Sequence, residues 1–130
     1  MDQEFAACDR LGIEVLYGTK GVSLVTDPKS GAVTGIRIKD ENGFSELETK
    51  TVVIAAGGFE ANMEMRTRYL GPGWDLAKVR GTRYNTGDGI EMALKVGAQS
   101  YGQWSGCHSV AWERYATDFG EVEHPHAGYR

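Results

Sequence analysis

The sequence has few cysteines, and their positions give no sign of a disulfide framework. Cys8 and Cys107 are the only two, they stand far apart in the chain, and neither belongs to a CxxC pair. Small secreted domains that depend on disulfides carry several closely spaced cysteines. We therefore expect a reducing, cytoplasmic setting.

The sequence also has no apolar run of membrane-spanning length and no excess of basic residues. A helix that crosses a bilayer needs about 20 predominantly apolar residues. Fourteen Lys and Arg stand against eighteen Asp and Glu, a net charge of -4, so no basic stripe is available to displace counterions from a phosphate backbone. The acidic beginning of the chain lacks the apolar centre of a signal peptide. We expect neither a nucleic-acid partner nor a membrane span.

Proline is scarce, with 3 residues, whereas 18 glycines occur mainly at predicted turns. The glycines separate apolar stretches instead of forming a low-complexity tract, so tight backbone geometry is used repeatedly. A chain of 130 residues that is 41% hydrophobic can bury a core of its own. We expect an ordered domain.

The first fifty residues predict one helix followed by a β-meander. Apolar residues recur at three-residue spacing in residues 3–11, and Gly12 ends that predicted helix. Residues 13–17 predict a short apolar strand, and Gly35 predicts a bulge. Three strands, GVSLVTD, AVTGIRIKD and FSELET, with turn signals at 27–31 and 41–43, predict an antiparallel meander.

The chain changes character at TVVIAAGG, residues 51–58. Three consecutive β-branched apolar residues, Val52, Val53 and Ile54, predict a strand buried on both faces, as in a parallel sheet covered by helices. After it, Asn62 is predicted to cap a helix that ends at Leu70, and Thr86 to cap another that ends at Gly97. The predicted fold class is α+β, with an antiparallel meander and buried parallel-type strands followed by helices.

Two glycine stretches are candidates for ligand binding. Gly57 and Gly58 end the predicted strand, where a ligand could approach the backbone closely, although a plain strand-to-helix turn explains them equally well. Gly87-x-Gly89 resembles half of a dinucleotide fingerprint, but no strand is evident before it and Met92 occupies the third glycine position. A simple helix start, with Asp88 accepting from first-turn amides, remains the alternative.

Histidine and cysteine residues near the end of the chain could be interpreted as metal ligands. His108 lies outside any obvious helical period, where a structural role is common. Cys107, His124 and His126 complete the candidate ligand set, but their spacing fits no standard zinc pattern. We predict no metal site.

The order of the motifs is more specific than any one of them. YGTKGVSLV, GAVTGIRI, VVIAAGGFEANMEM and YNTGDGIEMALKVGAQ, in this order, resemble the flavoprotein subunits of the fumarate reductase and succinate dehydrogenase family. The FAD-dependent tricarballylate dehydrogenases look most similar, through RYLGPGWDLAKVRGTRYNTGDG and QWSGCHS. The resemblance spans nearly the whole chain and implies an FAD-dependent oxidoreductase.

The resemblance implies roles for six residues. The adenine of FAD would lie near Gly21, and Asp88 in TGDG matches a residue that binds the cofactor in this family. The family's A(T/A)GG turn, which passes close to the cofactor, matches Ala56, Gly57 and Gly58. His108 matches a histidine that binds a substrate carboxylate, although the spacing from Asp88 is one residue shorter than the common pattern.

The resemblance also implies what this chain does not contain. The GxGxxG unit for the FAD diphosphate is missing, and the arginine that serves as acid or base is expected beyond Arg130, so no catalytic residue is predicted here. We expect an internal piece, with residues 1–60 from the end of the FAD-binding domain and residues 61–130 from the start of the substrate-capping domain.

The implied reaction is hydride transfer between flavin and a di- or tricarboxylic acid, with that small acid as the partner. The alternative is an isolated, non-catalytic piece that folds without FAD. Such a piece would form a homodimer through surface that other segments normally cover.

Overall fold

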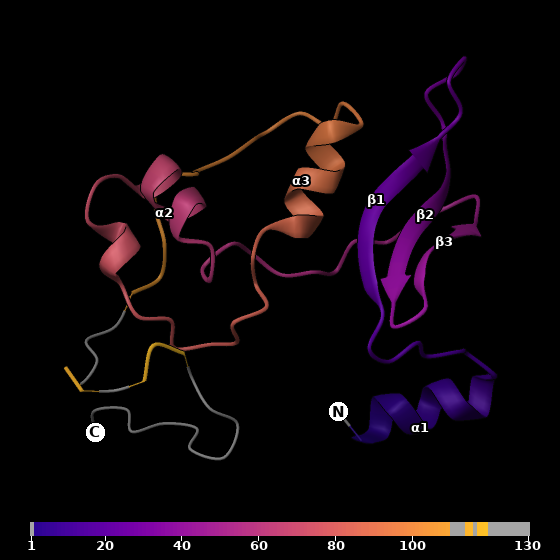
Figure 1. Cartoon of the computed structure of the whole chain (residues 1–130), viewed down its shortest axis with the longest axis horizontal. Helices are drawn as coiled ribbons and strands as arrows, with labels where there is room; N and C mark the ends of the chain where they lie inside the picture. Colours follow the sequence, from indigo (N-terminus) through magenta and orange to yellow (C-terminus); the bar gives the residue numbers. More distant parts are fainter. Residues whose placement is uncertain (1, 110–113, 116, 120–130) are drawn as a thin grey trace. The chain divides into compact units, whose positions relative to one another are not determined.

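The computed structural model describes residues 2–109, 114–115 and 117–119, which form two compact units, residues 1–52 and residues from 53 onward (Figure 1). The first unit contains α1 (Asp2–Leu11), β1 (Lys20–Thr26), β2 (Val33–Asp40) and β3 (Gly43–Glu48). The second contains α2 (Met63–Leu70), the short 3-10 helix η1 (Trp74–Leu76) and α3 (Asp88–Lys95). The predicted division at residue 60 into two functional domains stays a prediction.

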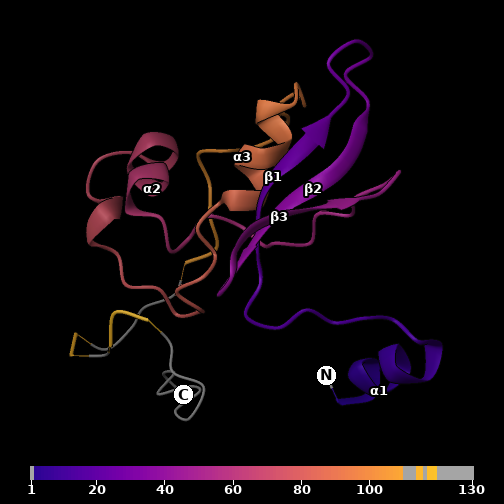
Figure 2. The ribbon, with the colours of Figure 1, turned by 45° about the vertical axis from the view of Figure 1, so that its right-hand side comes forward.

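The predicted meander is confirmed: β1, β2 and β3 pair antiparallel in that order and lie side by side in Figures 1 and 2. The first hairpin turn is held by Asp27, whose Oδ1 accepts from the amides of Lys29 at 3.0 Å and Ser30 at 2.7 Å. Donation by the Ser30 amide, the Ser30 hydroxyl and the Lys29 amide lowers the pKa of Asp27. In the second turn Asp40 accepts from the amide of Asn42 at 2.8 Å.

Gly35 lies in β2 where the backbone of β3 leaves no room for a side chain. A Cβ at this position would lie 2.6 Å from the carbonyl oxygen of Leu47. The predicted irregularity is also present, because Val25 pairs with Gly35 while Thr26 pairs with Val33, which leaves Thr34 as an extra residue. Ile38 is the buried apolar residue of this sheet.

Helix ends follow the sequence signals closely. The amide of Ile13 bonds to the carbonyl of Cys8 and the amide of Gly12 to that of Asp9, so α1 ends in a Schellman pattern with Gly12 at φ 67°. The same pattern ends α3, with Gly97 at φ 95°. Both helices therefore end where a glycine can adopt the left-handed conformation.

Two predicted strands are wrong in the described chain. Residues 13–17 form no strand, and residues 51–58 run without pairing instead of lying buried in a parallel sheet. Val53 is 85% exposed and Ile54 is 39% exposed. Apolar, β-branched sequence favours an extended backbone, but a strand also needs a neighbouring strand to pair with, and the described residues provide none for either segment.

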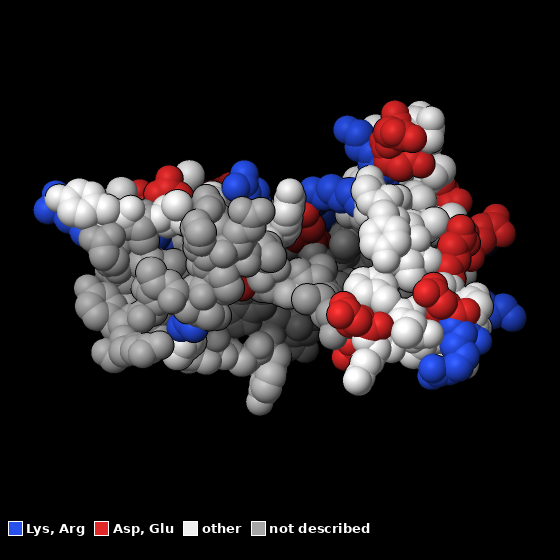
Figure 3. All heavy atoms as spheres, turned by 90° about the horizontal axis from the view of Figure 1, so that it is seen from below, with Lys and Arg blue, Asp and Glu red and all other residues white. Residues whose placement is uncertain are grey.

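Charged side chains of both signs lie on the face drawn in Figure 3. Acidic and basic groups are interspersed among its described residues, in line with the similar numbers of Lys and Arg, 14, and of Asp and Glu, 18. No helix within the described ranges is long and apolar enough to cross a bilayer.

Candidate functional site

The two glycine stretches singled out by the sequence lie together in the second unit. The amide of Gly87 donates to the carbonyl of Gly58 at 3.0 Å, and the amide of Ala61 donates to the carbonyl of Asn85 at 2.9 Å. Asn62 joins the same two segments, since its side-chain amide donates to the carbonyl of Thr86 at 2.9 Å. Residues 58–62 are thereby tied to the turn that precedes α3.

Glycine is required at this junction because side chains fill the space around it. A Cβ on Gly87, which has φ 83°, would lie 2.4 Å from Sδ of Met65. A Cβ on Gly89 would lie 2.9 Å from Cβ of Ala56. The first turn of α3 therefore lies against the alanine that precedes Gly57, and the structure brings Ala56, Gly57 and Gly58 together with the helix that carries Asp88.

The start of α3 differs from the prediction. Its N-cap is Gly87 in the left-handed conformation, and no side chain caps the first-turn amides. Thr86 is one residue too early to serve as the cap, and its hydroxyl instead donates to Oδ2 of Asp88 at 3.1 Å. The helix dipole favours a negative charge near this helix start.

Asn62 caps α2 as predicted. Its Oδ1 accepts from the amide of Met65 at 3.1 Å. Because the amide group of the same side chain also bonds to Thr86, one residue both starts α2 and fixes the turn before α3.

Residue Gly21, the remaining predicted cofactor residue, lies in β1 of the first unit. It pairs with Ile38 next to an irregularity at Val22. The four other predicted cofactor residues, Ala56, Gly57, Gly58 and Asp88, belong to the second unit.

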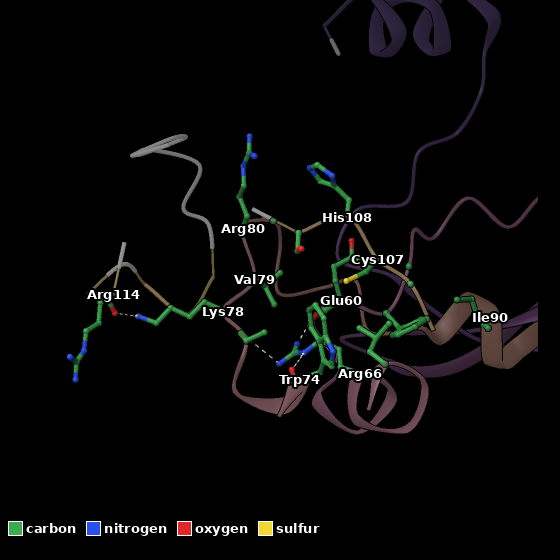
Figure 4. A pocket seen from close by; sticks show the side chains of 17 residues that line it. Glu60, Arg66, Trp74, Lys78, Val79, Arg80, Ile90, Cys107, His108 and Arg114 are labelled. Atoms are coloured by element: carbon green, nitrogen blue, oxygen red, sulfur yellow. Dashed lines mark hydrogen bonds between the residues drawn. The ribbon is translucent and has the colours of Figure 1, made fainter. Parts of the chain in front are cut away.

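A cavity of about 760 Å³ opens beside the glycine junction, within the second unit (Figure 4). Its walls are largely apolar and aromatic, and they include Gly58, Phe59, Trp74, Val79, Ile90 and His108. The sequence-predicted cofactor residue Gly58 and substrate residue His108 thus line the same hollow. Pockets of this size and character are typical of small-molecule sites.

An aromatic cluster holds the segment that leads to His108. Trp104 lies 4.8 Å from Tyr69 and 6.4 Å from Phe59 between ring centroids, and Phe59 and Tyr69 are 5.4 Å apart. Since Phe59 directly follows Gly58, these contacts tie residues 101–108, which have no helix or strand of their own, to the glycine junction.

Arg66 is the feature that sequence reasoning missed. This side chain is only 5% exposed and donates to four backbone carbonyls, those of Glu60, Trp74, Asp75 and Ala77. It fixes the loop through η1, which forms one cavity wall. The sequence did contain a signal. Arg66 stands three positions after Met63 and four before Leu70, so a charged residue lies on the same helix face as two apolar ones.

The metal hypothesis gains nothing from the structure. Among the described residues, no three His, Cys, Asp or Glu side chains come close enough to hold a metal ion. His124 and His126 lie outside the described residues.

Comparison with known proteins identifies the relatives of this chain. The sequence model of the family described as "FAD binding domain" matches residues 3–109. The chain is 35% identical over 104 residues to a vinyl phenol reductase of Lactiplantibacillus plantarum, covering 72% of this chain and 19% of that protein. It is 34% identical over 88 residues to an NADH:fumarate oxidoreductase of Klebsiella pneumoniae, covering 67% of this chain and 9% of the relative.

A solved structure shares the fold. The open conformation of a flavocytochrome c3 fumarate reductase superposes with a TM-score of 0.71 and 29% identity, over 75% of this chain and 17% of that one. The chain therefore spans between about a tenth and a fifth of the length of these three proteins.

Proposed function

The chain belongs to the FAD-binding domain family and FAD is its cofactor, and from this premise we propose that it forms part of an enzyme that acts on a small di- or tricarboxylic acid. The enzyme dehydrogenates or reduces that acid, as an oxidoreductase similar to fumarate reductase. The observation that carries the proposal is the backbone bond from Gly87 to Gly58, which joins the two stretches that sequence assigns to the cofactor.

The residues present fit a flavin. Ala55 and Ala56 are small and exposed, so no bulky side chain blocks approach to the backbone before Gly57. Beside them, α3 begins at Gly87 without a side-chain cap, and its dipole favours the negative charge of a reduced flavin or of a cofactor oxygen. In this proposal Ala56, Gly57, Gly58 and Asp88 contact the cofactor, and Gly21 contacts its adenine.

A bound flavin supplies the acceptor or donor of a hydride at N5. The chain's own part is to bind and orient: His108, on the wall of the cavity, donates a hydrogen bond to a carboxylate of the acid and withdraws charge from the carbon framework. No residue of this chain is assigned the proton transfer, which we assign to an arginine elsewhere in the protein. A cytoplasmic location is part of the same proposal.

Retention of FAD by the purified chain tests this proposal. After incubation with FAD and desalting, we expect a flavin absorption spectrum, and we expect Asp88→Ala to lower FAD affinity by about tenfold to a hundredfold, the range for one hydrogen bond to a charged group. Asp75→Ala is the matched control, because Asp75 is an exposed carboxylate in η1 that does not line the cavity. Equal affinities of the Asp88 and Asp75 variants would contradict the assigned role.

The exposed segment 51–58 favours a second candidate, a non-catalytic piece that associates with another copy of itself. Val53 and Ile54 expose apolar area and unpaired backbone, which promotes strand pairing between chains. A colourless parent chain that sediments as a dimer would support this candidate over flavin binding.

A further inference from the structure

The cavity beside the glycine junction is more basic than the chain as a whole. Its lining residues include four cations, Arg66, Lys78, Arg80 and Arg114, and one carboxylate, that of Glu60, whereas the chain has a net charge of -4. Cations gathered on low-dielectric walls raise the local concentration of anions. The charge distribution therefore favours an anionic ligand in this cavity.

Most of these charged groups already have partners. Arg66 bonds to four carbonyls, and Nζ of Lys78 donates to the carbonyl of Arg114 at 3.0 Å. Oε1 of Glu60 accepts from the side chain of Asn85 at 2.6 Å. Only side chains without such commitments can take up a ligand at little cost.

Arg80 and His108 are such side chains. Neither makes a hydrogen bond, ion pair or ring contact with the part of the chain that the structure describes. Figure 4 shows the guanidinium of Arg80 and the imidazole of His108 extending on the same side of the cavity rim. Two groups that donate hydrogen bonds, one of them a permanent cation, thus line the same cavity.

The backbone of Arg80 is nevertheless fixed. The preceding residue, Val79, is buried, and its amide donates to the carbonyl of Asp118 at 2.8 Å in a bridge between Val79 and Phe119. A side chain that is free to bind on an anchored backbone loses less entropy when it takes up a ligand than one on a loose loop.

We propose that Arg80 is a specificity-determining residue that binds a substrate carboxylate together with His108, an inference that rests on the proposed function. The guanidinium donates two parallel N–H bonds to one carboxylate, and His108 donates a further bond to the same acid. Arg80 then selects anionic acids over uncharged alkenes. The relatives named above include both a reductase of fumarate, which is a dicarboxylate, and one of vinyl phenols, which have no carboxylate.

Titration with succinate and with its uncharged diamide, succinamide, tests the inference. Binding is followed in the full chain with FAD present, at constant ionic strength, through the imidazole NMR signals of His108, assigned with His108→Gln. We expect Arg80→Gln to weaken succinate binding by about tenfold to a hundredfold and Arg80→Lys by less, because lysine keeps the charge but not the paired donors. Succinamide binding should not depend on residue 80.

The matched control is Arg68→Gln, which removes an exposed arginine of α2 that does not line the cavity. It leaves succinate affinity unchanged if the effect at Arg80 is local. The inference is overturned if succinate causes no saturable shift of the His108 signals in the parent chain. It is also overturned if the Arg80→Gln variant binds succinate as tightly as the parent chain or as the Arg68→Gln variant. Flavin retention is measured on the same samples, so that loss of FAD counts against the proposed function and unchanged succinate affinity with FAD retained counts against Arg80 alone.

Discussion

Single residues at the glycine junction are constrained in two separate ways, by backbone conformation and by space. Gly87 has φ 83°, and a Cβ there would meet Sδ of Met65 at 2.4 Å and Cβ of Phe59 at 3.1 Å. Gly97 has a similar φ of 95°, but nothing lies within 4 Å of its Cβ position. A substitution at Gly97 therefore tests backbone strain alone, whereas one at Gly87 tests strain and overpacking together.

We expect Gly87→Ala to destabilise the second unit by about 2–5 kcal/mol, from left-handed strain of about 1–2 kcal/mol and overpacking of about 1–3 kcal/mol. Gly97→Ala should cost only the strain, about 1–2 kcal/mol. Urea unfolding followed by tryptophan fluorescence measures both, since Trp74 and Trp104 belong to the second unit. Equal losses in the two variants would mean that Met65 yields freely to the added methyl group.

The residue scale also shows what the sequence can predict. Gly12, Gly97 and Asn62 act on neighbours within a few positions, so the helix ends they mark were predicted correctly. Thr86 was predicted to cap α3, but the choice between Thr86 and Gly87 depends on the bond from Gly87 to Gly58, which lies far away in the sequence. Caps that depend on nearby residues could be predicted from the sequence. The bond from Gly87 to Gly58, which favours Gly87 over Thr86 as the cap, could not.

At the scale of elements, one buried side chain of α2, that of Arg66, bonds to the backbone of the loop through η1. Arg66 on α2 donates to carbonyls of Trp74, Asp75 and Ala77 in and after η1, and to Glu60 before α2. A backbone of irregular shape needs donors for its carbonyls, and a single guanidinium with five N–H groups supplies four of these bonds.

Replacing Arg66 with methionine keeps an unbranched, apolar stem but removes these donors, and we expect a loss of stability on the order of 3 kcal/mol because partly buried carbonyls are left unpaired. Arg68→Met on the same helix is the control. Arg68 pairs with Glu64 at the surface, where such a pair contributes about 0.3–0.5 kcal/mol. Thermal unfolding should separate the two variants clearly, and similar melting temperatures would show that Arg66 is dispensable.

Elements that depend on distant partners were the ones predicted wrongly. The meander was predicted because Asp27, Asn42 and Gly43 mark turns that join neighbouring strands. Residues 13–17 and 51–58 are also apolar, but within the described chain no strand pairs with either segment. Composition gives the tendency to form a strand, and only pairing decides whether the strand exists.

At the scale of the whole molecule, the residues assigned to FAD fall in both compact units. Gly21 belongs to the first, whereas Ala56, Gly57, Gly58 and Asp88 belong to the second. Each unit has a small core: within the described residues, the buried apolar side chains are Ile38 in the first unit and Met65, Val79 and Met92 in the second. Such units gain much from a ligand, because a ligand at a hundred times its Kd adds about 2.7 kcal/mol of stability.

In the proposed function one FAD contacts Gly21 of the first unit and four residues of the second, so its binding should protect segments of both units. We expect FAD to slow hydrogen exchange in β1 around Gly21 as well as at the start of α3, whereas FMN, which lacks the adenine assigned to Gly21, should protect only α3 and residues 55–61. The comparison is made by mass spectrometry of peptides from the two units, at FAD and FMN concentrations that give equal saturation. Protection confined to the second unit with both ligands would remove Gly21 from the site, and protection of neither unit would leave the chain without a flavin site of its own.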